Sequence, residues 1–316
     1  MDLQGNRDSS RFGGGYNPRR EEEDMVQSAA QPLLRVKDVA VRFGGIVALD
    51  GVSFEVARGR IVGLIGPNGA GKTTLFNCVS RLYDCDRGEI AFDGGSLLAV
   101  PRHRVAALGI GRTFQNLALF RSMSVLDNVM VGYHCRSRGG FLANALRLPL
   151  AVRAERLAAA KAREVLALLG LEALAAKPVA ELPFGTQKRV ELARALASEP
   201  KLLLLDEPAS GLNHEEVGRL GALIRELRDR LKLTVLLVEH HMSLVMSIAD
   251  WVVALNFGRR TSRGSIPSWC GPTWGVDAAR GIRAPRRLRR HASDPRDQLH
   301  NGRKGDHGLT RGERCR

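Results

Sequence analysis

The chain alternates between short apolar runs of strand length and longer stretches with helical spacing. Four of the runs are almost wholly apolar: IVGLI (61–65), LLLL (202–205), TVLLV (234–238) and WVVAL (251–255). Runs this apolar, separated by helices, predict an α/β protein whose parallel sheet is covered on both faces. Val52, Phe54 and Val56 instead alternate with polar neighbours, which predicts a half-buried strand.

Helical patterns fill the stretches between these runs. KTTLFNCVSRL (72–82) is predicted to form a helix directly after a glycine-rich loop. One helical stripe, at i, i+3, i+4, i+7 and i+11, consists of Leu220, Leu223, Ile224, Leu227 and Leu231. Asn213, followed by Glu216, is expected to cap that helix. Residues 98–186 contain no comparable strand, and Arg153–Gly170 is helix-forming, so this segment is predicted to be a mostly helical insertion.

Both ends of the chain lack this patterning. Residues 1–32 are rich in Gly, Arg, Glu and Ser, which predicts a disordered extension, and they contain no apolar stretch for a secretory signal. The patterned domain covers residues 33–258. Residues 259–316 are rich in Arg, Gly, Pro and Ser, and are expected to be a basic tail without a core.

Composition narrows the class of protein. With 316 residues, 44% hydrophobic and 26% charged, the chain suits one large globular domain or two modest ones. No apolar run approaches the roughly 18–20 residues that cross a bilayer, so a membrane-spanning protein is not expected. Five cysteines without a CxxC pair make a disulfide framework or a zinc site unexpected, and a reducing cytosol suits them.

The formal charge of +15 is concentrated at one end. Residues 259–316 hold 15 Lys and Arg against 5 Asp and Glu. RAPRRLRR (283–290) would suit the phosphates of a nucleic acid, which makes binding to nucleic acid one hypothesis. A solvated tail is the simpler interpretation, because a run of charges most often means solvated disorder. A shift assay on short DNA, with and without residues 259–316, separates the two.

A glycine-rich loop provides the strongest chemical motif. It matches G-x-x-x-x-G-K-[ST] at every fixed position and consists of Gly66, Pro67, Asn68, Gly69, Ala70, Gly71, Lys72 and Thr73. Glycines let consecutive backbone N–H groups point inward at a helix N-terminus, where they bind phosphate. An ordinary glycine-rich turn is the alternative. A buried strand before the loop and a helix after it favour a nucleotide site.

An acidic pair follows the next apolar run. Asp206 ends the run LLLLD, so its carboxylate would reach Mg²⁺ beside the phosphate loop. Glu207 would then polarise the water that attacks the γ-phosphate. Alone, such a pair is equally well a surface turn. The upstream phosphate loop favours the functional interpretation.

With both motifs in place, the chain resembles an ATP-binding subunit of an ABC transporter from about Leu33 to Gly258. Further features match the family in order and spacing: Phe43 in VRFGG (the adenine-stacking aromatic), Gln115 in RTFQN (the Q-loop), LPFGTQKRVELARALA at 182–197 (the signature), Gly211-Leu212-Asn213 (the D-loop) and His240 in LVEHHM (the switch histidine).

The resemblance implies both a fold and a chemistry. The fold is a RecA-like P-loop NTPase core with an N-terminal antiparallel β subdomain and an inserted helical subdomain. Mg²⁺ would be held by Thr73, Gln115 and Asp206. Glu207 would act as general base and His240 would hold the γ-phosphate, while Gln115 would also contact the attacking water. ATP would contact Phe43, residues 66–73, Thr74 and, from a second subunit, Phe184, Gly185 and Thr186.

Two of these assignments have ordinary alternatives. Phe43 would serve equally as a core aromatic. His241 adjoins His240, but the residue directly after Val238-Glu239 matches the family pattern, which favours His240. Cys78, in the helix after the loop, is expected to pack rather than react.

The signature departs from the commonest form, Leu-Ser-Gly-Gly-Gln. Pro183 and Phe184 replace Ser-Gly, and Thr186 replaces Gln, while Gly185 is kept. The usual serine hydroxyl is therefore missing. Gly185 still permits close backbone approach, and the helix N-terminus still offers N–H groups, so the signature is expected to function.

The Leu-Pro-aromatic-Gly variant, the GLN turn and the segment 133–156 together resemble the larger ATPase of prokaryotic branched-chain amino acid importers. Related subunits that import urea or amides, or export lipopolysaccharide, are the alternatives. A nucleic-acid-associated ABC ATPase is a further one, but the chain has no CxxC pair, long coiled coil or second phosphate loop of the kind expected in such relatives. A lipid exporter would be expected to have a shorter insertion after Val131. The resemblance implies a second ATPase subunit, transmembrane permease subunits and, indirectly, an external substrate-binding protein. It places the chain at the cytoplasmic face of the inner membrane.

The resemblance ends within a few residues of Gly258. The family continues there with a helix-forming segment, whereas residues 260–269 (RTSRGSIPSW) lose hydrophobic patterning. The tail is therefore either diverged or the product of a frameshift. Translating the gene in the other frames beyond codon 258 distinguishes these.

Overall fold

The computed structural model of the protein describes residues 31–136 and 149–265, all of which belong to one compact unit. Predictions for residues 1–30, 137–148 and 266–316 lie outside the described residues.

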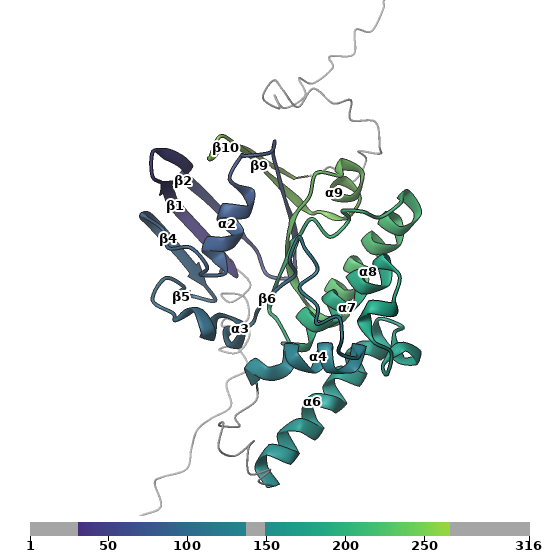
Figure 1. Cartoon of the computed structure of the whole chain (residues 1–316). Helices are drawn as coiled ribbons and strands as arrows, with labels where there is room; N and C mark the ends of the chain where they lie inside the picture. Colours follow the sequence, from purple (N-terminus) through teal and green to yellow (C-terminus); the bar gives the residue numbers. More distant parts are fainter. Residues whose placement is uncertain (1–30, 137–148, 266–316) are drawn as a thin grey trace, which may run out of the picture. The chain divides into compact units, whose positions relative to one another are not determined.

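A six-stranded sheet forms the centre of this unit (Figure 1). Its strands are β3 (Ile61–Ile65), β6 (Ile110–Arg112), β7 (Leu202–Asp206), β8 (Thr234–Val238), β9 (Trp251–Asn256) and β10 (Arg259–Ser265). They lie in the order β10-β9-β3-β8-β7-β6, and every pairing is parallel except that of β10 with β9. The four apolar runs of the sequence are thus four adjacent strands of a parallel sheet, as predicted.

Strand β7 shows why these runs are continuously apolar. Leu202 and Leu204 belong to one hydrophobic core, and Leu203 and Leu205 belong to the other. Successive side chains of a strand point to opposite faces, so a strand buried on both faces has no polar position. Each fully buried leucine stabilises the fold by roughly 1.5–3 kcal/mol relative to exposure.

A second, antiparallel sheet covers one face of the first. Its strands are β1 (Leu34–Phe43), β2 (Ile46–Val56), β4 (Arg87–Phe92) and β5 (Gly95–Ser96), in the order β2-β1-β4-β5. Val52, Phe54 and Val56 are buried, as their alternation predicts. They share a core with α2 (Lys72–Val79), whose Cys78 is also fully buried.

Helices cover the other face. They are α7 (Phe184–Ala197), α8 (His214–Leu231) and α9 (Met242–Ile248). Helix α8 begins with the predicted cap: Asn213 Oδ1 accepts the Glu216 N–H, and the Glu216 carboxylate accepts the Asn213 N–H, both at 2.9 Å. Its apolar stripe faces the core at Ile224 and Leu227, while Leu231 in the last turn is exposed.

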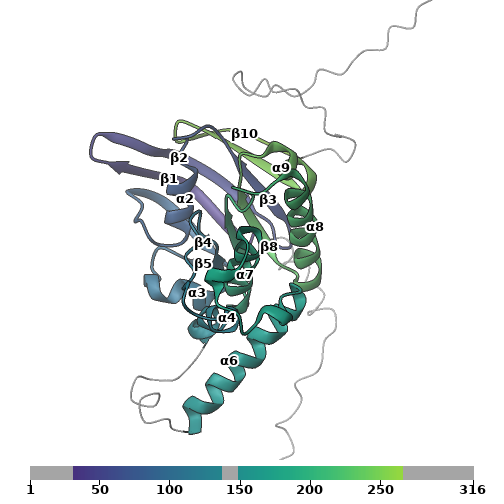
Figure 2. The same cartoon turned by 45° about the vertical axis from the view of Figure 1, so that its right-hand side comes forward.

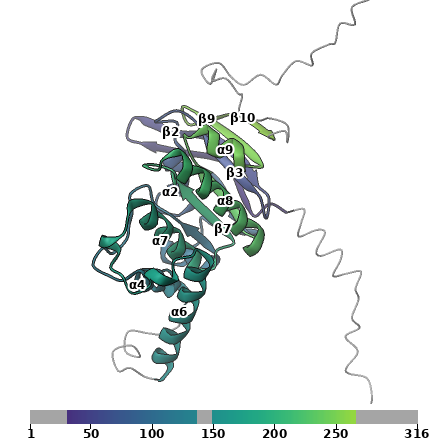
Figure 3. The same ribbon diagram turned by 90° about the vertical axis from the view of Figure 1, so that its right-hand side faces the viewer.

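The predicted insertion is helical but begins later than residue 98. Helices α4 (Val125–Tyr133) and α6 (Pro149–Leu168) pack against each other and against α7 (Figures 2 and 3). Short helical elements are α3 (Val105–Leu108) and the 3₁₀ turns Arg102–Arg104, His134–Arg136, Glu172–Leu174 and Val179–Glu181. Strand β6 lies inside the range predicted to be helical. It is only three residues long, too short to show a periodic pattern.

The structure also carries the sheet beyond Gly258, where the sequence predicted a tail without a core. Strand β10 pairs antiparallel with β9, and Arg259 Nε donates to Asp50 Oδ2 at 2.8 Å. The polar pattern of 259–265 gave no indication of an edge strand. Within the described ranges, no helix is both long and apolar enough to cross a membrane.

Candidate active site

The predicted site residues gather where the parallel strands β3, β8 and β7 end. These strands are neighbours, so the loops that follow them emerge at one edge of the sheet. The loop after β3 leads into α2, Asp206 ends β7, and the loop after β8 contains the two histidines. The fold therefore brings together residues separated by more than 150 positions in the sequence.

The glycine-rich loop can lie this close to its neighbours only because two positions lack a side chain. A Cβ on Gly66 would lie 2.3 Å from Leu255 O, and one on Gly71 would lie 2.6 Å from Ala48 O. Gly71, at φ +93°, is also the N-cap of α2. The loop thus presents its backbone at the N-terminus of a helix, the geometry that binds phosphate. Thr73 and Thr74 lie in the first turn of α2.

Lys72 lies inside this loop. Its ammonium donates to Gly66 O at 2.7 Å and to Pro67 O at 2.9 Å, and the residue is buried. Burial lowers the pKa of Lys72, while the nearby carboxylates of Glu207 and Asp206 raise it in part. The positive charge is therefore held among backbone oxygens at the centre of the candidate phosphate site.

Asp206 is buried at the end of β7, beside a positive charge. Arg112 Nη2 donates to Asp206 Oδ2 at 3.1 Å. Burial raises the pKa of Asp206, and Arg112 opposes this by lowering it. Within the described part of the chain, Asp206 Oδ1 is buried without a hydrogen-bond partner. A buried carboxylate oxygen left in this state fits a metal ion or its bound water.

Arg112 was not singled out by the sequence. Its guanidinium lies between the rings of Phe76 and Phe114, and Nη1 donates to Asn77 Oδ1 at 2.8 Å. Arg112 is the last residue of β6, the strand next to β7. Recognition of β6 would have placed this arginine beside Asp206, but three residues gave no strand pattern.

Glu207 meets two other predicted site residues. Gln115 Nε2 donates to Glu207 Oε2 at 3.0 Å, and His240 Nδ1 lies 3.8 Å from the same oxygen. The backbone of Glu207 is left-handed, at φ +47°, and its N–H donates to Val238 O at 2.9 Å. A non-glycine residue in this conformation is strained, and such strain tends to accumulate at functional sites. The carboxylate is thus aimed at a cluster of polar groups.

The adjacent histidines share Glu239 as a neighbour, since its Oε2 accepts the His240 N–H at 3.0 Å and lies 4.0 Å from His240 Nδ1, but the closest ring contact of each is different. His241 Nδ1 lies 3.3 Å from the carboxylate of Glu239, which is fully buried and also accepts the Ala209 N–H at 2.8 Å. The structure therefore places His240 beside Glu207 and ties His241 to the structural carboxylate of Glu239. The histidine preferred from the sequence is the one placed at the acidic pair.

Phe43 ends β1, and 46% of the residue is exposed, so it lies outside the core. Its ring makes an edge-to-face contact with Tyr83, with the centroids 5.2 Å apart. Ala48, on the strand that follows, approaches Gly71 of the phosphate loop. An exposed aromatic face on the neighbouring hairpin suits stacking on a base.

Phe184, Gly185 and Thr186 form the first turn of α7, after the N-cap Pro183. Phe184 is half-exposed and lies against Gly211, where an added Cβ would come within 2.8 Å of the ring. The signature thus packs on the D-loop. In the described residues, no hydrogen bond or ion pair joins Phe184–Thr186 to the phosphate loop of the same chain.

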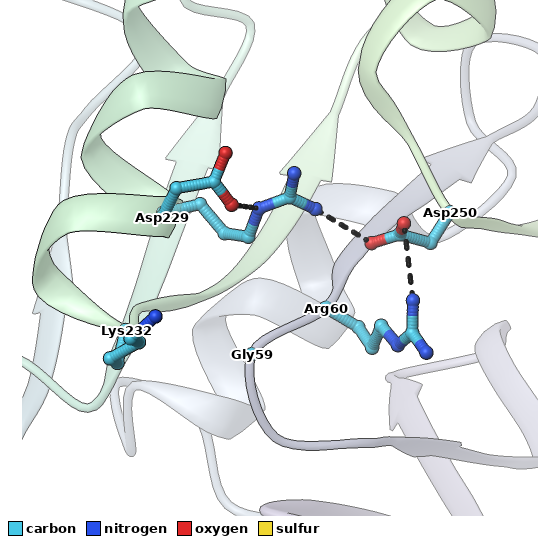
Figure 4. Close-up of a pocket in the computed structure, with 6 residues that line it drawn as sticks. Gly59, Arg60, Asp229, Lys232 and Asp250 are labelled. Atoms are coloured by element: carbon cyan, nitrogen blue, oxygen red, sulfur yellow. Dashed lines mark hydrogen bonds and ion pairs between the residues drawn. The ribbon is translucent and has the colours of Figure 1, made fainter.

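A charged cavity of about 380 Å³ lies away from this site (Figure 4). Its lining residues are Gly59, Arg60, Arg228, Asp229, Lys232 and Asp250. The Asp250 carboxylate accepts Arg228 Nη1 at 3.3 Å and the Ile61 N–H at 2.8 Å, and it lies 3.6 Å from Arg60 Nη1. These contacts fasten the start of β3, at its end opposite the phosphate loop, to α8. None of the predicted site residues lines the cavity.

The chain is similar in sequence to known proteins. The family described as ABC transporter matches residues 49–210. The chain is 42% identical over 236 residues to the high-affinity branched-chain amino acid transport ATP-binding protein BraF of Pseudomonas aeruginosa, covering 75% of this chain and 92% of that protein. It is 41% identical over 236 residues to LivG, of the same description, from Escherichia coli K12, with the same coverage of 75% and 92%.

Solved structures are similar over the same part of the chain. The ADP conformation of an ATP-binding cassette from an ABC transporter has a TM-score of 0.65 at 30% identity, covering 74% of this chain and 91% of that one. A nucleotide-free ATP-binding cassette from an ABC transporter also has a TM-score of 0.65, at 28% identity, covering 74% and 92%.

Proposed function

The chain belongs to the ABC transporter family as an ATP-binding, ATP-hydrolysing subunit, and on this premise we propose that it powers an importer of branched-chain amino acids. The observation that carries the proposal is the 42% identity to BraF, which extends over 92% of that protein. The Leu-Pro-aromatic-Gly form of the signature points to the same subfamily.

The phosphate loop and its helix bind the substrate ATP in this proposal. The backbone N–H groups of residues 66–73 other than Pro67 bind the phosphates, and the ammonium of Lys72 offsets their charge, with Thr74 at the same helix start. Phe43 stacks on the adenine. The supporting geometry is a buried cation inside a loop whose glycines bring backbone close to the ligand.

Mg²⁺ fits the acidic side of the site. Thr73, Asp206 and Gln115 would hold it, and the unpartnered Oδ1 of Asp206 supplies an oxygen donor of the kind that Mg²⁺ prefers. When bound, the ion neutralises charge on the transferring phosphoryl group. Arg112 keeps the Asp206 carboxylate available by opposing the rise in its pKa on burial.

Glu207 is proposed to accept a proton from the attacking water. Gln115 fixes one of its carboxylate oxygens and lies where it can orient that water. His240, whose Nδ1 lies 3.8 Å from the same oxygen, holds the γ-phosphate. Charge on the phosphoryl group is then stabilised by positioned donors, the usual source of catalysis in phosphoryl transfer.

The site is proposed to be completed by a second ATPase subunit. Phe184, Gly185 and Thr186 pack on the D-loop of their own chain, and their helix N-terminus remains available for the nucleotide of a partner. ATP would then join two subunits, and its hydrolysis would release them. The insertion would hold permease subunits at the cytoplasmic face of the inner membrane, with an external substrate-binding protein delivering the substrate.

Transport by the assembled complex tests the proposal. The chain is reconstituted in liposomes with the permease subunits and binding protein encoded by neighbouring genes. We expect ATP-dependent uptake of leucine, isoleucine and valine, and none with a non-hydrolysable ATP analogue. Uptake of urea or short amides instead, or export of lipopolysaccharide, would reject the proposed substrate while leaving the ATPase assignment in place.

Replacing Arg112 by Met is expected to raise the Mg²⁺ concentration that ATP hydrolysis requires. Loss of the guanidinium raises the pKa of Asp206 further, so the carboxylate becomes protonated at higher pH than in the wild type. We expect the Mg²⁺ concentration for half-maximal ATPase activity to rise by about tenfold, and the acidic limb of the pH profile to move to higher pH.

Arg112→Lys is the matched control for this change. It keeps a positive charge near Asp206 but lacks the second terminal nitrogen, which donates to Asn77 Oδ1, so an intermediate effect is expected. A Mg²⁺ dependence and a pH profile that are unchanged in Arg112→Met would contradict the role given to this arginine.

A further inference from the structure

Three polar side chains of α7 reach the backbone of the Q-loop. Glu191 Oε1 accepts the Phe114 N–H at 3.0 Å, and Lys188 Nζ lies 3.5 Å from Gln115 O. Arg194 Nη1 donates to Ala118 O, further along the same loop. The spacing of 188, 191 and 194 places all three on one face of the helix. The Q-loop is thus fastened to the signature helix through side chains.

Glu191 is the most deeply buried member of this group, although Lys188 is buried as well. Only 2% of the residue is exposed, and burial raises the pKa of its carboxyl. The Phe114 N–H, Lys188, Arg194 and the Ala118 N–H all oppose this rise. A carboxyl group is costly to bury in a helix where an apolar residue would pack well. Its position is explained by the backbone donor that it satisfies.

That donor lies where the chain leaves the sheet. The Thr113 N–H donates to Leu204 O at 3.0 Å and extends the β6 pairing by one residue. At Phe114 the acceptor is no longer a strand but the side chain of Glu191. The peptide group held in this way joins Thr113 to Phe114, the residue before Gln115. The side chain of Gln115 in turn donates to Glu207 Oε2 at 3.0 Å.

We propose that Glu191 is a positioning residue: it holds the Thr113–Phe114 peptide so that Gln115, the next residue, meets Glu207, and it joins this contact to the helix that begins with Phe184–Thr186. The inference rests on the proposed function of Glu207 and Gln115. It goes further, because it states that a side chain of the signature helix holds the Q-loop in place.

Two substitutions of Glu191 test this proposal, and they differ in whether the new side chain can accept the Phe114 N–H. Glu191→Gln keeps an oxygen acceptor for the Phe114 N–H, whereas Glu191→Leu has a similar size and no acceptor. In the full-length chain, we expect Glu191→Leu to lower kcat for ATP by about tenfold and to change KM by less than about threefold. Glu191→Gln is expected to stay within about threefold of the wild-type kcat, because the hydrogen bond is kept.

A double-mutant cycle separates positioning from general stability. If Glu191 acts through Gln115, adding Glu191→Leu to Gln115→Ala lowers kcat no further. A purely structural residue would instead lower the melting temperature and leave kcat per folded molecule unchanged, in the wild-type background as well as in Gln115→Ala. Glu226→Leu, on the exposed face of α8, is the surface control and is expected to leave kcat within about twofold.

These experiments distinguish a failure of the role proposed for Glu191 from a failure of the proposed ATPase function. No ATP hydrolysis by the wild-type chain, even with its permease, would reject the proposed function itself. Wild-type hydrolysis with an unchanged kcat in Glu191→Leu would reject only the inference. Glu191→Met, a more adaptable apolar side chain, replaces Glu191→Leu if the latter does not fold. Failure of both apolar variants to fold would assign Glu191 to stability and overturn the proposal.

Discussion

Replacing Glu207 by Gln is expected to lower the rate of ATP hydrolysis by about 100-fold or more while ATP binding stays near the wild-type level. The amide has almost the same shape as the carboxylate and can still meet Gln115, but it cannot accept a proton from water. The left-handed backbone at φ +47° is unchanged by this substitution. Phosphate release and the Kd for ATP are the measurements.

The same variant is expected to accumulate as a closed pair of subunits with ATP between them, because closure no longer ends in cleavage. Size-exclusion chromatography with ATP and Mg²⁺, compared with ADP, would detect the pair. Glu226→Gln on the surface of α8 is the matched control, and its ATPase rate is expected to remain close to the wild type. Wild-type turnover in Glu207→Gln would reject the assignment of Glu207 as general base.

The strands of the central sheet were predictable wherever burial on both faces left a continuous apolar run. Leu202–Leu205 and 234–238 are such runs, and they form β7 and β8. The helix cap at Asn213 was predictable because capping is a local interaction between neighbouring residues. Strand β6 was not, because Ile110–Arg112 becomes a strand only through its pairing with β7.

The residues of the candidate site also fall into two groups: those that a contiguous motif identifies and those that only the folded structure identifies. The phosphate loop and the acidic pair are contiguous motifs, so the sequence located them directly. Arg112 and Glu191 have no motif of their own. Each becomes notable only through a distant partner, Asp206 for Arg112 and the Phe114 backbone for Glu191. Long-range polar contacts of this kind depend on the packed fold and leave no periodic trace in one sequence.

Strand β10 was missed for the same reason as β6. Loss of hydrophobic patterning after Gly258 predicted an unstructured tail from residue 259, yet Arg259–Ser265 pair with β9. Backbone hydrogen bonds with β9 specify this strand, and Arg259 pairs with Asp50. An edge strand needs fewer apolar residues than a central one, so polarity alone was a poor guide here.

Replacing Lys72 by Met is expected to abolish ATP hydrolysis and to raise the Kd for ATP by about 100-fold, since charge-assisted contacts with phosphate are among the strongest in proteins. The ammonium already lies inside the phosphate loop, where it donates to Gly66 O and Pro67 O. Burial lowers its pKa, and the carboxylates of Glu207 and Asp206 raise it in part. A bound triphosphate adds further negative charge, which favours the protonated lysine.

The lowered pKa of Lys72 allows a second test of the role of this lysine in ATP binding. Because Lys72 loses its proton at a lower pH than an ordinary lysine, the affinity of the wild type for ATP should begin to fall at a correspondingly lower alkaline pH. Lys72→Met should lack this dependence. Lys232→Met, in the cavity at the other end of the sheet, is the control, and both its affinity and its alkaline limb should match the wild type. Near-normal ATP binding by Lys72→Met would show that the loop between β3 and α2 is not the phosphate site.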